Sequence, residues 1–470
     1  MANEPDIWRH VDENAPDLIA LSDRVWGMPE TCYQETRSAA EHKVELERQG
    51  FQVTTNVAGI PTAIMGEAGE GGPVVAFLGE YDALPDLSQE ADVAEPRPVE
   101  RGGNGHGCGH NLLGSGAMLA AVAVRDWLNA TGRPGRVRYY GCPAEEGGAA
   151  KAFMVRDGAF DDVDIAITWH PHSICDVTHA DSLANARIDF TFRGRASHAS
   201  ASPHLGRSAL DAVELMNVGV NYLREHVPTE SRIHYALIDA GGIAPNVVQA
   251  NATVRYLIRS PDLAGLSPLI ERVRKVAEGA AMMTETTVEA RTLSAVSNLV
   301  PNEPLEAAMR RHLEALGPPP FDVADRRFAE EIRATFGEEE VEHALRGFGM
   351  VGEMPGPLCD RLVPAGNKRT GVGGSTDVGD VSWVVPTVQM WGATYAIGTP
   401  FHTWQMVAQG KSAAAHKGMV HASKVMAAVG QEAFEDLGLI EAAKQDLAKR
   451  TGRTPYVCPL PPETKPPLDM

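Results

Sequence analysis

The sequence has no long apolar segment and comparatively few basic residues. Its nearest candidate for a membrane span, Ala117 to Val124, falls far short of the roughly 18 consecutive apolar residues that a bilayer requires. Lys and Arg together number 42 against 62 Asp and Glu, which gives a net charge of −20. Because an acidic chain repels phosphate backbones, we expect neither nucleic acid nor a membrane as a partner.

Signals for secretion are missing as well. The first ten residues, MANEPDIWRH, carry acidic side chains early and lack the basic segment followed by an apolar one that marks a signal peptide. The six cysteines are scattered, without the spacing of a disulfide framework. These absences predict a cytoplasmic protein. Its 470 residues exceed what one hydrophobic core usually holds, so we expect two domains.

The stretch NGHGCGHN, residues 104–111, is the most distinctive local pattern. It places His106, Cys108 and His110 at alternate positions, so that Cys108 and His110 can reach one centre from an extended backbone. A thiolate and imidazoles are preferred ligands of zinc and related transition metals. By itself the stretch is equally compatible with a glycine-rich turn that holds a buried thiol and two surface histidines.

Further metal-ligand types follow three apolar segments that read as strands. Residues 74–78 lead into GEYDALP with Asp82, residues 136–142 lead into PAEEGG with Glu145 and Glu146, and residues 164–169 lead to His170. In an open α/β sheet, ligands bind at the carboxyl ends of the strands. This repeated placement favours a metal site over chance, and two adjacent carboxylates, which diverge, indicate two separate roles.

The pattern changes between residues 186 and 298. Alternating or apolar segments at 186–193, 232–238, 247–258 and 286–292 predict strands, and segments 206–225 and 263–283 predict helices. This βαββαβ order is that of a ferredoxin-like domain. We therefore predict an α/β catalytic domain formed by residues 1–185 and 299–470, interrupted by an α+β insertion at 186–298.

The segment after this insertion contributes helices and one more histidine. Residues 303–347 are charged and helical, GSTD (374–377) is either a turn or a ligand-orienting segment, and His402 precedes a helix that we expect to run from Ser412 to Ala428 and to end at Val429 and Gly430. A proline-rich tail follows.

Taken in order, GEYDALP, GHGCGHN, PAEEGG, WHPH, SHAS, APNVV, GSTDVGD and PFHTWQ resemble the aminoacylase/carboxypeptidase family of dinuclear metallopeptidases. Within that family they resemble the amidohydrolase branch that includes p-aminobenzoyl-glutamate hydrolases and indole-acetyl-amino-acid hydrolases. The resemblance runs through nearly the whole chain. It implies a zinc-peptidase-like catalytic domain, with a mixed sheet and helices on both faces, and an inserted domain that serves as lid and dimerisation domain.

The resemblance also implies roles for individual residues. Two divalent metal ions, zinc or manganese, would be held by Cys108, His110, Glu146, His170 and His402. Glu145 matches the general base and Asp82 the aspartate that orients a metal ligand. Glu80 stands where the carboxypeptidase branch has a metal-binding histidine, so that ligand is absent here. Cys108 takes the bridging place of an aspartate in that branch.

In the lid, His198 matches a residue that stabilises the oxyanion in the active site of a neighbouring protomer, although the residues alone favour a solvated loop histidine. Asn246 and Arg259 match positions that bind the substrate carboxylate or contact the partner. Phe401 replaces a glycine found in many relatives, which would narrow the substrate pocket. The lid therefore predicts a homodimer, and the alternative is pairing to a homologous subunit.

These residues predict hydrolysis of the amide bond of an N-acyl or N-aroyl amino acid. A dipeptidase or a general aminoacylase is the alternative within enzymes, and a silent subunit that completes a homologous active partner is the alternative outside them. The complete ligand set weakens the latter. A redox or structural role for Cys108 is a further alternative, which thiol titration with and without a chelator distinguishes.

Overall fold

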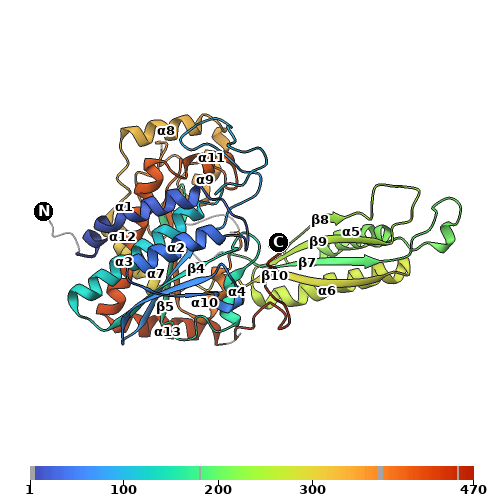
Figure 1. The fold of residues 1–470 in the computed structure, drawn as a ribbon, viewed down its shortest axis with the longest axis horizontal. Helices are drawn as coiled ribbons and strands as arrows, with labels where there is room; N and C mark the ends of the chain where they lie inside the picture. Colours follow the sequence, from blue (N-terminus) through green and yellow to red (C-terminus); the bar gives the residue numbers. More distant parts are fainter. Residues whose placement is uncertain (1–5, 179–181, 355, 368–373, 453–454, 470) are drawn as a thin grey trace.

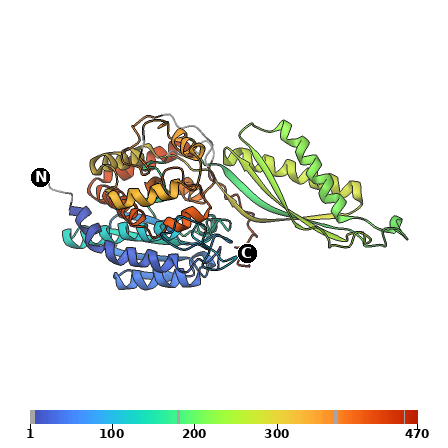
Figure 2. The ribbon, with the colours of Figure 1, turned by 90° about the horizontal axis from the view of Figure 1, so that it is seen from above.

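The fold was analysed in a computed structural model that describes residues 6–178, 182–354, 356–367, 374–452 and 455–469. The N-terminal and C-terminal parts of the chain form a rounded domain, called the catalytic domain below after its predicted role. A narrow domain, called the lid after its predicted role, projects from it (Figures 1 and 2). Among the described residues, no helix combines the length and apolar composition needed to cross a membrane. The first five residues of the N-terminal segment lie outside the described part.

A seven-stranded mixed sheet forms the centre of the catalytic domain. Its strand order is β1-β2-β4-β3-β5-β11-β6, in which β3, β4, β5 and β11 run parallel and the outer pairings are antiparallel. The strands are β1 (Gln52–Thr55), β2 (Ile64–Glu70), β3 (Val74–Glu80), β4 (Gly135–Cys142), β5 (Ile165–His172), β6 (Asp176–Val177) and β11 (Thr387–Ala393).

Helices cover both faces of this sheet. Alternate residues of β3 enter two hydrophobic clusters: Val75 and Phe77 join the one under α1, α3 and α12, whereas Ala76 and Leu78 join the one that includes α4 and α10. The helices of this domain are α1 (Asp6–Trp26), α2 (Thr36–Arg48), α3 (His110–Thr131), α4 (Ala150–Arg156), α7 (Glu303–Leu316), α8 (Val323–Arg333), α9 (Glu338–Gly347), α10 (Val378–Val384), α11 (Trp404–Gln409), α12 (Ala413–Glu435) and α13 (Leu437–Thr451). The predicted α/β class with helices on both faces is confirmed.

The lid is a four-stranded antiparallel sheet with two helices on one face. Its elements follow the predicted βαββαβ order: β7 (Ala184–Arg193), α5 (Ala209–Leu223), β8 (Arg232–Asp239), β9 (Asn251–Ser260), α6 (Leu263–Thr284) and β10 (Thr287–Val296). The strand order is β10-β7-β9-β8, so β8 is an edge strand. Strands β7 and β10 connect the lid to the catalytic domain side by side (Figure 1).

One predicted helix boundary is wrong. Helix α12 does not end at Gly430 but continues to Glu435. The sequence suggested a stop at this glycine, yet Gly430 lies where the helix packs closely on Phe77 and Val124, and a Cβ there would be tightly crowded. The glycine therefore serves helix packing rather than helix termination.

Asp380 on α10 ties three distant segments together. Its carboxyl group is fully buried and accepts hydrogen bonds from the backbone amide and hydroxyl of Ser297, at 3.0 and 2.8 Å, and from the hydroxyl of Tyr456, at 3.0 Å. Burial raises the pKa of Asp380 to about 7.

We predict that Asp380→Asn changes the pH dependence of stability. The folded protein keeps the Asp380 proton up to about pH 7, whereas the unfolded chain releases it near pH 4, so this group lowers wild-type stability as pH rises through that window. The slope is at most about 1.4 kcal/mol per pH unit. Denaturant unfolding between pH 5 and 8 should show the wild type losing stability relative to the variant. Parallel curves would contradict this assignment.

Candidate functional site

The carboxyl ends of neighbouring parallel strands bring the predicted acidic residues to one place. Glu80, the last residue of β3, pairs with Cys142 at the end of β4. Asp82 follows β3 after one residue, and Glu145 and Glu146 follow β4 after two residues. His170 lies inside β5 rather than after it, near the same sheet edge.

The glycine-rich stretch supplies two more candidate ligands because its backbone passes very close to its neighbours. Gly109 has φ of 82°, and a side chain there would overlap the hydroxyl of Tyr395. Helix α3 starts at the next residue, His110. The amide of His402 donates to the carbonyl of Gly107 at 2.9 Å, which fixes this distant histidine beside Cys108.

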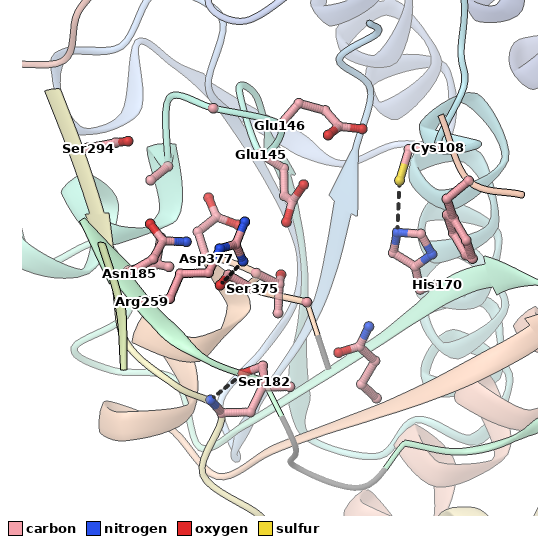
Figure 3. A pocket seen from close by; sticks show the side chains of 18 of the residues that line it. Cys108, Glu145, Glu146, His170, Ser182, Asn185, Arg259, Ser294, Ser375 and Asp377 are labelled. Atoms are coloured by element: carbon pink, nitrogen blue, oxygen red, sulfur yellow. Dashed lines mark hydrogen bonds between the residues drawn. The ribbon is translucent and has the colours of Figure 1, made fainter. Parts of the chain in front are cut away.

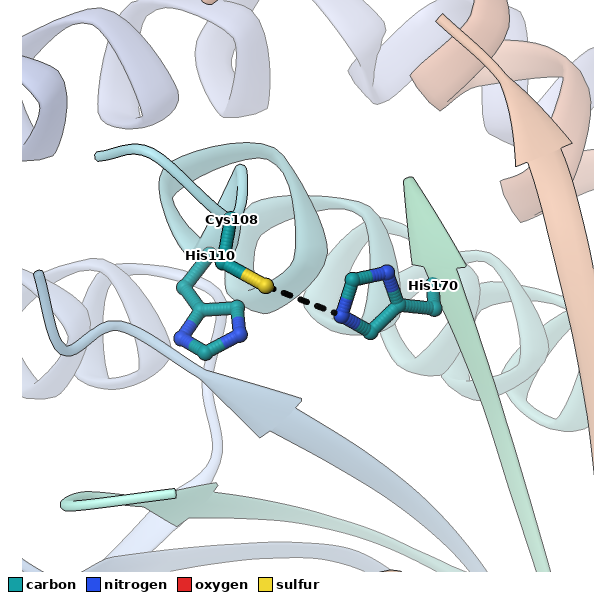
Figure 4. A group of neighbouring side chains, drawn as sticks. All are labelled: Cys108, His110 and His170. Carbon is teal, nitrogen blue, oxygen red and sulfur yellow. Dashed lines mark hydrogen bonds between the residues drawn. The ribbon is translucent and has the colours of Figure 1, made fainter. Parts of the chain in front are cut away.

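Two groups of potential metal ligands share Cys108. One consists of Cys108, His110 and His170, and the other of Cys108, Glu146 and His402; within each group the ligand atoms lie within 4.8 Å of one another. Cys108 Sγ and His170 Nε2 are 3.5 Å apart (Figure 4), and His402 Nε2 and Glu146 Oε2 are 3.4 Å apart. The shared thiol therefore lies between two neighbouring candidate cation positions.

Asp82 orients one ligand from each group. Its Oδ1 is 2.8 Å from Nδ1 of His110, and its Oδ2 accepts the backbone amide of Glu146 at 2.9 Å. With Nδ1 of His110 engaged in this way, Nε2 is left for a metal ion and lies 3.3 Å from Oε2 of Glu80. An outer carboxylate that fixes the tautomer and ring orientation of a histidine is typical of metal sites.

Three non-glycine residues around the site adopt the left-handed backbone region. Ala144 and Ala149, at φ 57° and 54°, flank the segment that carries Glu145 and Glu146, and His402 has φ of 58°. This conformation costs roughly 1–2 kcal/mol per residue, and such strain clusters at functional sites.

The sequence analysis missed Lys151. This fully buried lysine on α4 has its Nζ 2.6 Å from Oε1 of Glu80 and 2.6 Å from Oδ1 of Asp377. The signal in the sequence was a lysine within the apolar stretch AKAFMV, shortly after PAEEGG. Lys151 thus holds Glu80, at the position where the carboxypeptidase branch has histidine, and explains why Asp377 is buried.

The donor set fits divalent cations. Glu80 Oε2, His110 Nε2 and Glu146 Oε1 are buried without a hydrogen-bond partner among the described residues, and the first two are 3.3 Å apart. Burial and the adjacent Glu146 raise the pKa of the Cys108 thiol well above its usual range. A neighbouring cation is therefore required to hold the thiolate near neutral pH. Lys151 alone does not balance the carboxylates gathered here.

Glu145 lies next to these ligands and faces a cavity. Burial, reinforced by Glu80 and Asp377, raises the pKa of Glu145 well above its usual range. The cavity measures about 510 Å³ and lies between the catalytic domain and the lid. Figure 3 shows Cys108 and His170 on one side of it, Asn185, Arg259 and Ser375 on the other, and Glu145 and Glu146 between them.

The cavity wall includes some predicted substrate residues and lacks others. Arg259 and Phe401 line it, whereas His198 and Asn246 lie exposed in lid loops and do not reach it within the same chain. Arg187 and Trp391 also line it, and the sequence analysis had not singled them out. The alternating sequence NARIDF places Arg187 on the same strand face as Asn185, and this pattern could have identified Arg187.

Comparison with known proteins agrees with this arrangement. The profile of Peptidase family M20/M25/M40 matches residues 76–357. One subunit of p-aminobenzoyl-glutamate hydrolase from Escherichia coli (strain K12) is 46% identical, with 98% of this chain and 99% of the relative covered. Another subunit of that hydrolase, from the same organism, is 31% identical over 50% of this chain and 56% of its own length. The crystal structure of an aminobenzoyl-glutamate utilization protein from Klebsiella pneumoniae has a TM-score of 0.59 at 17% identity, covering 90% of this chain and 97% of its own.

We predict that Cys108→Ser loses bound metal at both positions, because both ligand groups contain this sulfur. Metal affinity should fall by at least about 100-fold, which is more than removal of an outer partner usually costs. Elemental analysis after dialysis measures this, with Cys175→Ser, another buried thiol outside both groups, as the control. Equal metal content in the two variants would contradict the shared role of Cys108.

Proposed function

Because the chain belongs to Peptidase family M20/M25/M40 and is a metal-dependent amidohydrolase, we propose that it cleaves the amide bond of an N-aroyl amino acid. The first substrate to test is p-aminobenzoyl-glutamate, after the name of the 46% identical relative. The cavity beside Glu145 supports this most directly, since one wall is aromatic and the other carries arginines.

We propose that two divalent ions occupy the groups that share Cys108. Cys108, His110 and His170 would hold one ion, and Cys108, Glu146 and His402 the other. The soft thiolate favours zinc over manganese. When bound, such ions lower the pKa of a water molecule and polarise the amide carbonyl.

Glu145 is the general base in this proposal. It takes a proton from the attacking water and returns it to the amine nitrogen of the leaving amino acid, because its side chain faces the cavity beside the candidate metal ligands. Glu146, the adjacent residue, is tied to Asp82 through its amide and turns towards His402 instead. The two neighbouring glutamates therefore divide proton transfer and metal binding between them.

The aromatic wall is suited to the acyl group. The ring centroid of His172 lies 4.9 Å from that of Trp391 and 5.3 Å from that of Phe401, and Phe401 also lies 5.9 Å from His170. A flat aroyl group can stack against these rings next to the metal ligands. The volume of about 510 Å³ is ordinary for a small-molecule site.

The opposite wall is suited to the amino acid. Arg259 of β9 donates from Nη1 to the hydroxyl of Ser375 at 2.8 Å, which leaves further guanidinium donors for a substrate carboxylate. The amide bond then lies between this arginine and the aromatic wall, beside Glu145.

We propose that the active form is a dimer joined through the lids. Edge strand β8 is largely exposed and carries Tyr235, Leu237 and Ile238 at 41%, 53% and 51% exposure. An exposed apolar edge of this kind is a natural pairing surface. His198, exposed on the lid and remote from the cavity of its own chain, would donate to the oxyanion in the partner's site, with Asn246 nearby. A homologous subunit in place of the second copy is the alternative, since the relatives include two different subunits of one hydrolase.

We place the protein in the cytoplasm. All six cysteines are free thiols, which fits a reducing compartment.

Glu145→Gln should lower kcat on p-aminobenzoyl-glutamate by on the order of 100- to 10,000-fold, because it removes the proton acceptor. Its metal content should match that of the wild type, whereas Glu146→Gln should lose metal. Glu47→Gln, an exposed residue paired with Lys43, serves as the neutral control. Full activity in Glu145→Gln would remove Glu145 from the mechanism.

Mixing two inactive variants tests the role of His198 across protomers. Glu145→Gln and His198→Ala homodimers each lack one group in both sites, but a mixed dimer contains one complete site. After protomer exchange at equal ratio, about a quarter of wild-type activity should return, because half of the dimers are mixed and each has one of two sites. A mixture that stays inactive, or a fully active monomer in gel filtration, would refute the role of His198 across the dimer. Activity that requires an added homologous subunit would support the alternative.

A further inference from the structure

The two faces of the lid sheet differ in chemistry. Residues such as Ile188 on β7 and Val254 on β9 are buried on the face covered by α5 and α6. The side chains that alternate with them include Asn185, Arg187 and Arg259, which line the cavity beside the metal ligands. Two cationic side chains therefore reach the substrate cavity from the lid.

Arg187 has unused hydrogen-bond donors beside the cavity. It is half-buried, yet it forms no hydrogen bond or ion pair with any described residue. Its guanidinium lies against Gly147, so closely that a Cβ on Gly147 would overlap Nη1. Asp189 and Glu146 act on this cation only through space, so its guanidinium donors stay unused, and a partly buried cation with unused donors favours an anion from outside the chain.

Another arginine on the same face of the lid sheet, in contrast, forms a direct ion pair. Arg255 on β9 forms a two-pronged ion pair with Asp189, with distances of 2.7 and 3.0 Å. Asp189 therefore bonds directly to the arginine outside the cavity, whereas no carboxylate among the described residues forms a hydrogen bond or ion pair with Arg187 inside it.

Arg187 and Arg259 lie close to each other. Asn185 pairs with Arg259 and Arg187 with Leu257 in the register of β7 and β9, so the two arginines are diagonal neighbours, within reach of long side chains. Burial lowers the pKa of Arg259, and the charge of Arg187 lowers it further. Two neighbouring guanidinium groups with free donors match two carboxylates on one small molecule.

We propose that Arg187 is a specificity-determining residue that binds the second carboxylate of an acidic amino acid, while Arg259 binds the first. The inference rests on the proposed amide hydrolysis and narrows its substrate class to conjugates of dicarboxylic amino acids. Conjugates of neutral amino acids leave Arg187 buried and unpaired, and are therefore selected against.

The test compares p-aminobenzoyl-glutamate with p-aminobenzoyl-glutamine, which replaces only the side-chain carboxylate by an amide. The wild type should prefer the glutamate conjugate by on the order of 100-fold in kcat/KM. Arg187→Met keeps an unbranched stem but removes the charged guanidinium, so the preference should fall to about threefold or less because activity on the glutamate conjugate alone decreases. Arg193→Met, on the same strand face outside the cavity, should keep the wild-type preference.

A wild type that hydrolyses both conjugates equally well would overturn the inference. So would an Arg187→Met variant that loses activity on both conjugates equally, because Arg187 would then only support the segment of Glu145 and Glu146.

Calorimetric binding of free glutamate and free glutamine to metal-loaded protein separates this inference from the proposed function. If no conjugate is hydrolysed but glutamate binds in an Arg187-dependent way, the proposed function fails and the inference stands. If conjugates are hydrolysed but Arg187→Met binds glutamate as tightly as the wild type does, the proposed function stands and the inference fails.

Discussion

Asp82 links the two halves of the candidate metal centre through its two oxygens, one on the ring of His110 and the other on the amide of Glu146. Because Asp82 is buried two residues past the end of β3, a small shift of this strand end displaces a ligand in each group. Lys151 fixes the other acidic residue of this strand end by pairing Glu80 with Asp377. The arrangement gathers more negative charge than the chain neutralises, and divalent cations supply the missing positive charge.

In the proposed function, the lid adds what the metal centre lacks, namely side chains that would recognise the substrate. Strands β7 and β9 turn one face towards their own helices and present the other to the cavity, where Asn185, Arg187 and Arg259 lie. The aromatic wall opposite comes from the catalytic domain, through Trp391 on β11 and Phe401 near His402. A substrate that contacts both walls places its amide bond beside Glu145.

Much of this arrangement could be predicted from residue patterns. The alternation of β7 and β9 with two helical segments gave the order of the lid elements, and parallel strand ends explained why Asp82, Glu145 and Glu146 meet. Local patterns could not show what depends on long-range packing. The sequence shows Lys151 only as a residue of a short helix, and its role depends on Glu80 and Asp377, which the fold brings next to it. Likewise, Gly430 looks like a helix terminator in the sequence, whereas in the fold it allows close packing against Phe77. Whether His198 acts in a neighbouring protomer depends on a second chain.

Zinc-edge X-ray absorption on the zinc-loaded enzyme, combined with a metal count, tests the central claim most directly. We predict about two zinc ions per chain, with a sulfur neighbour at about 2.3 Å from each, because both share Cys108. A single ion per chain, or two ions without a sulfur neighbour, would contradict a centre built around this cysteine.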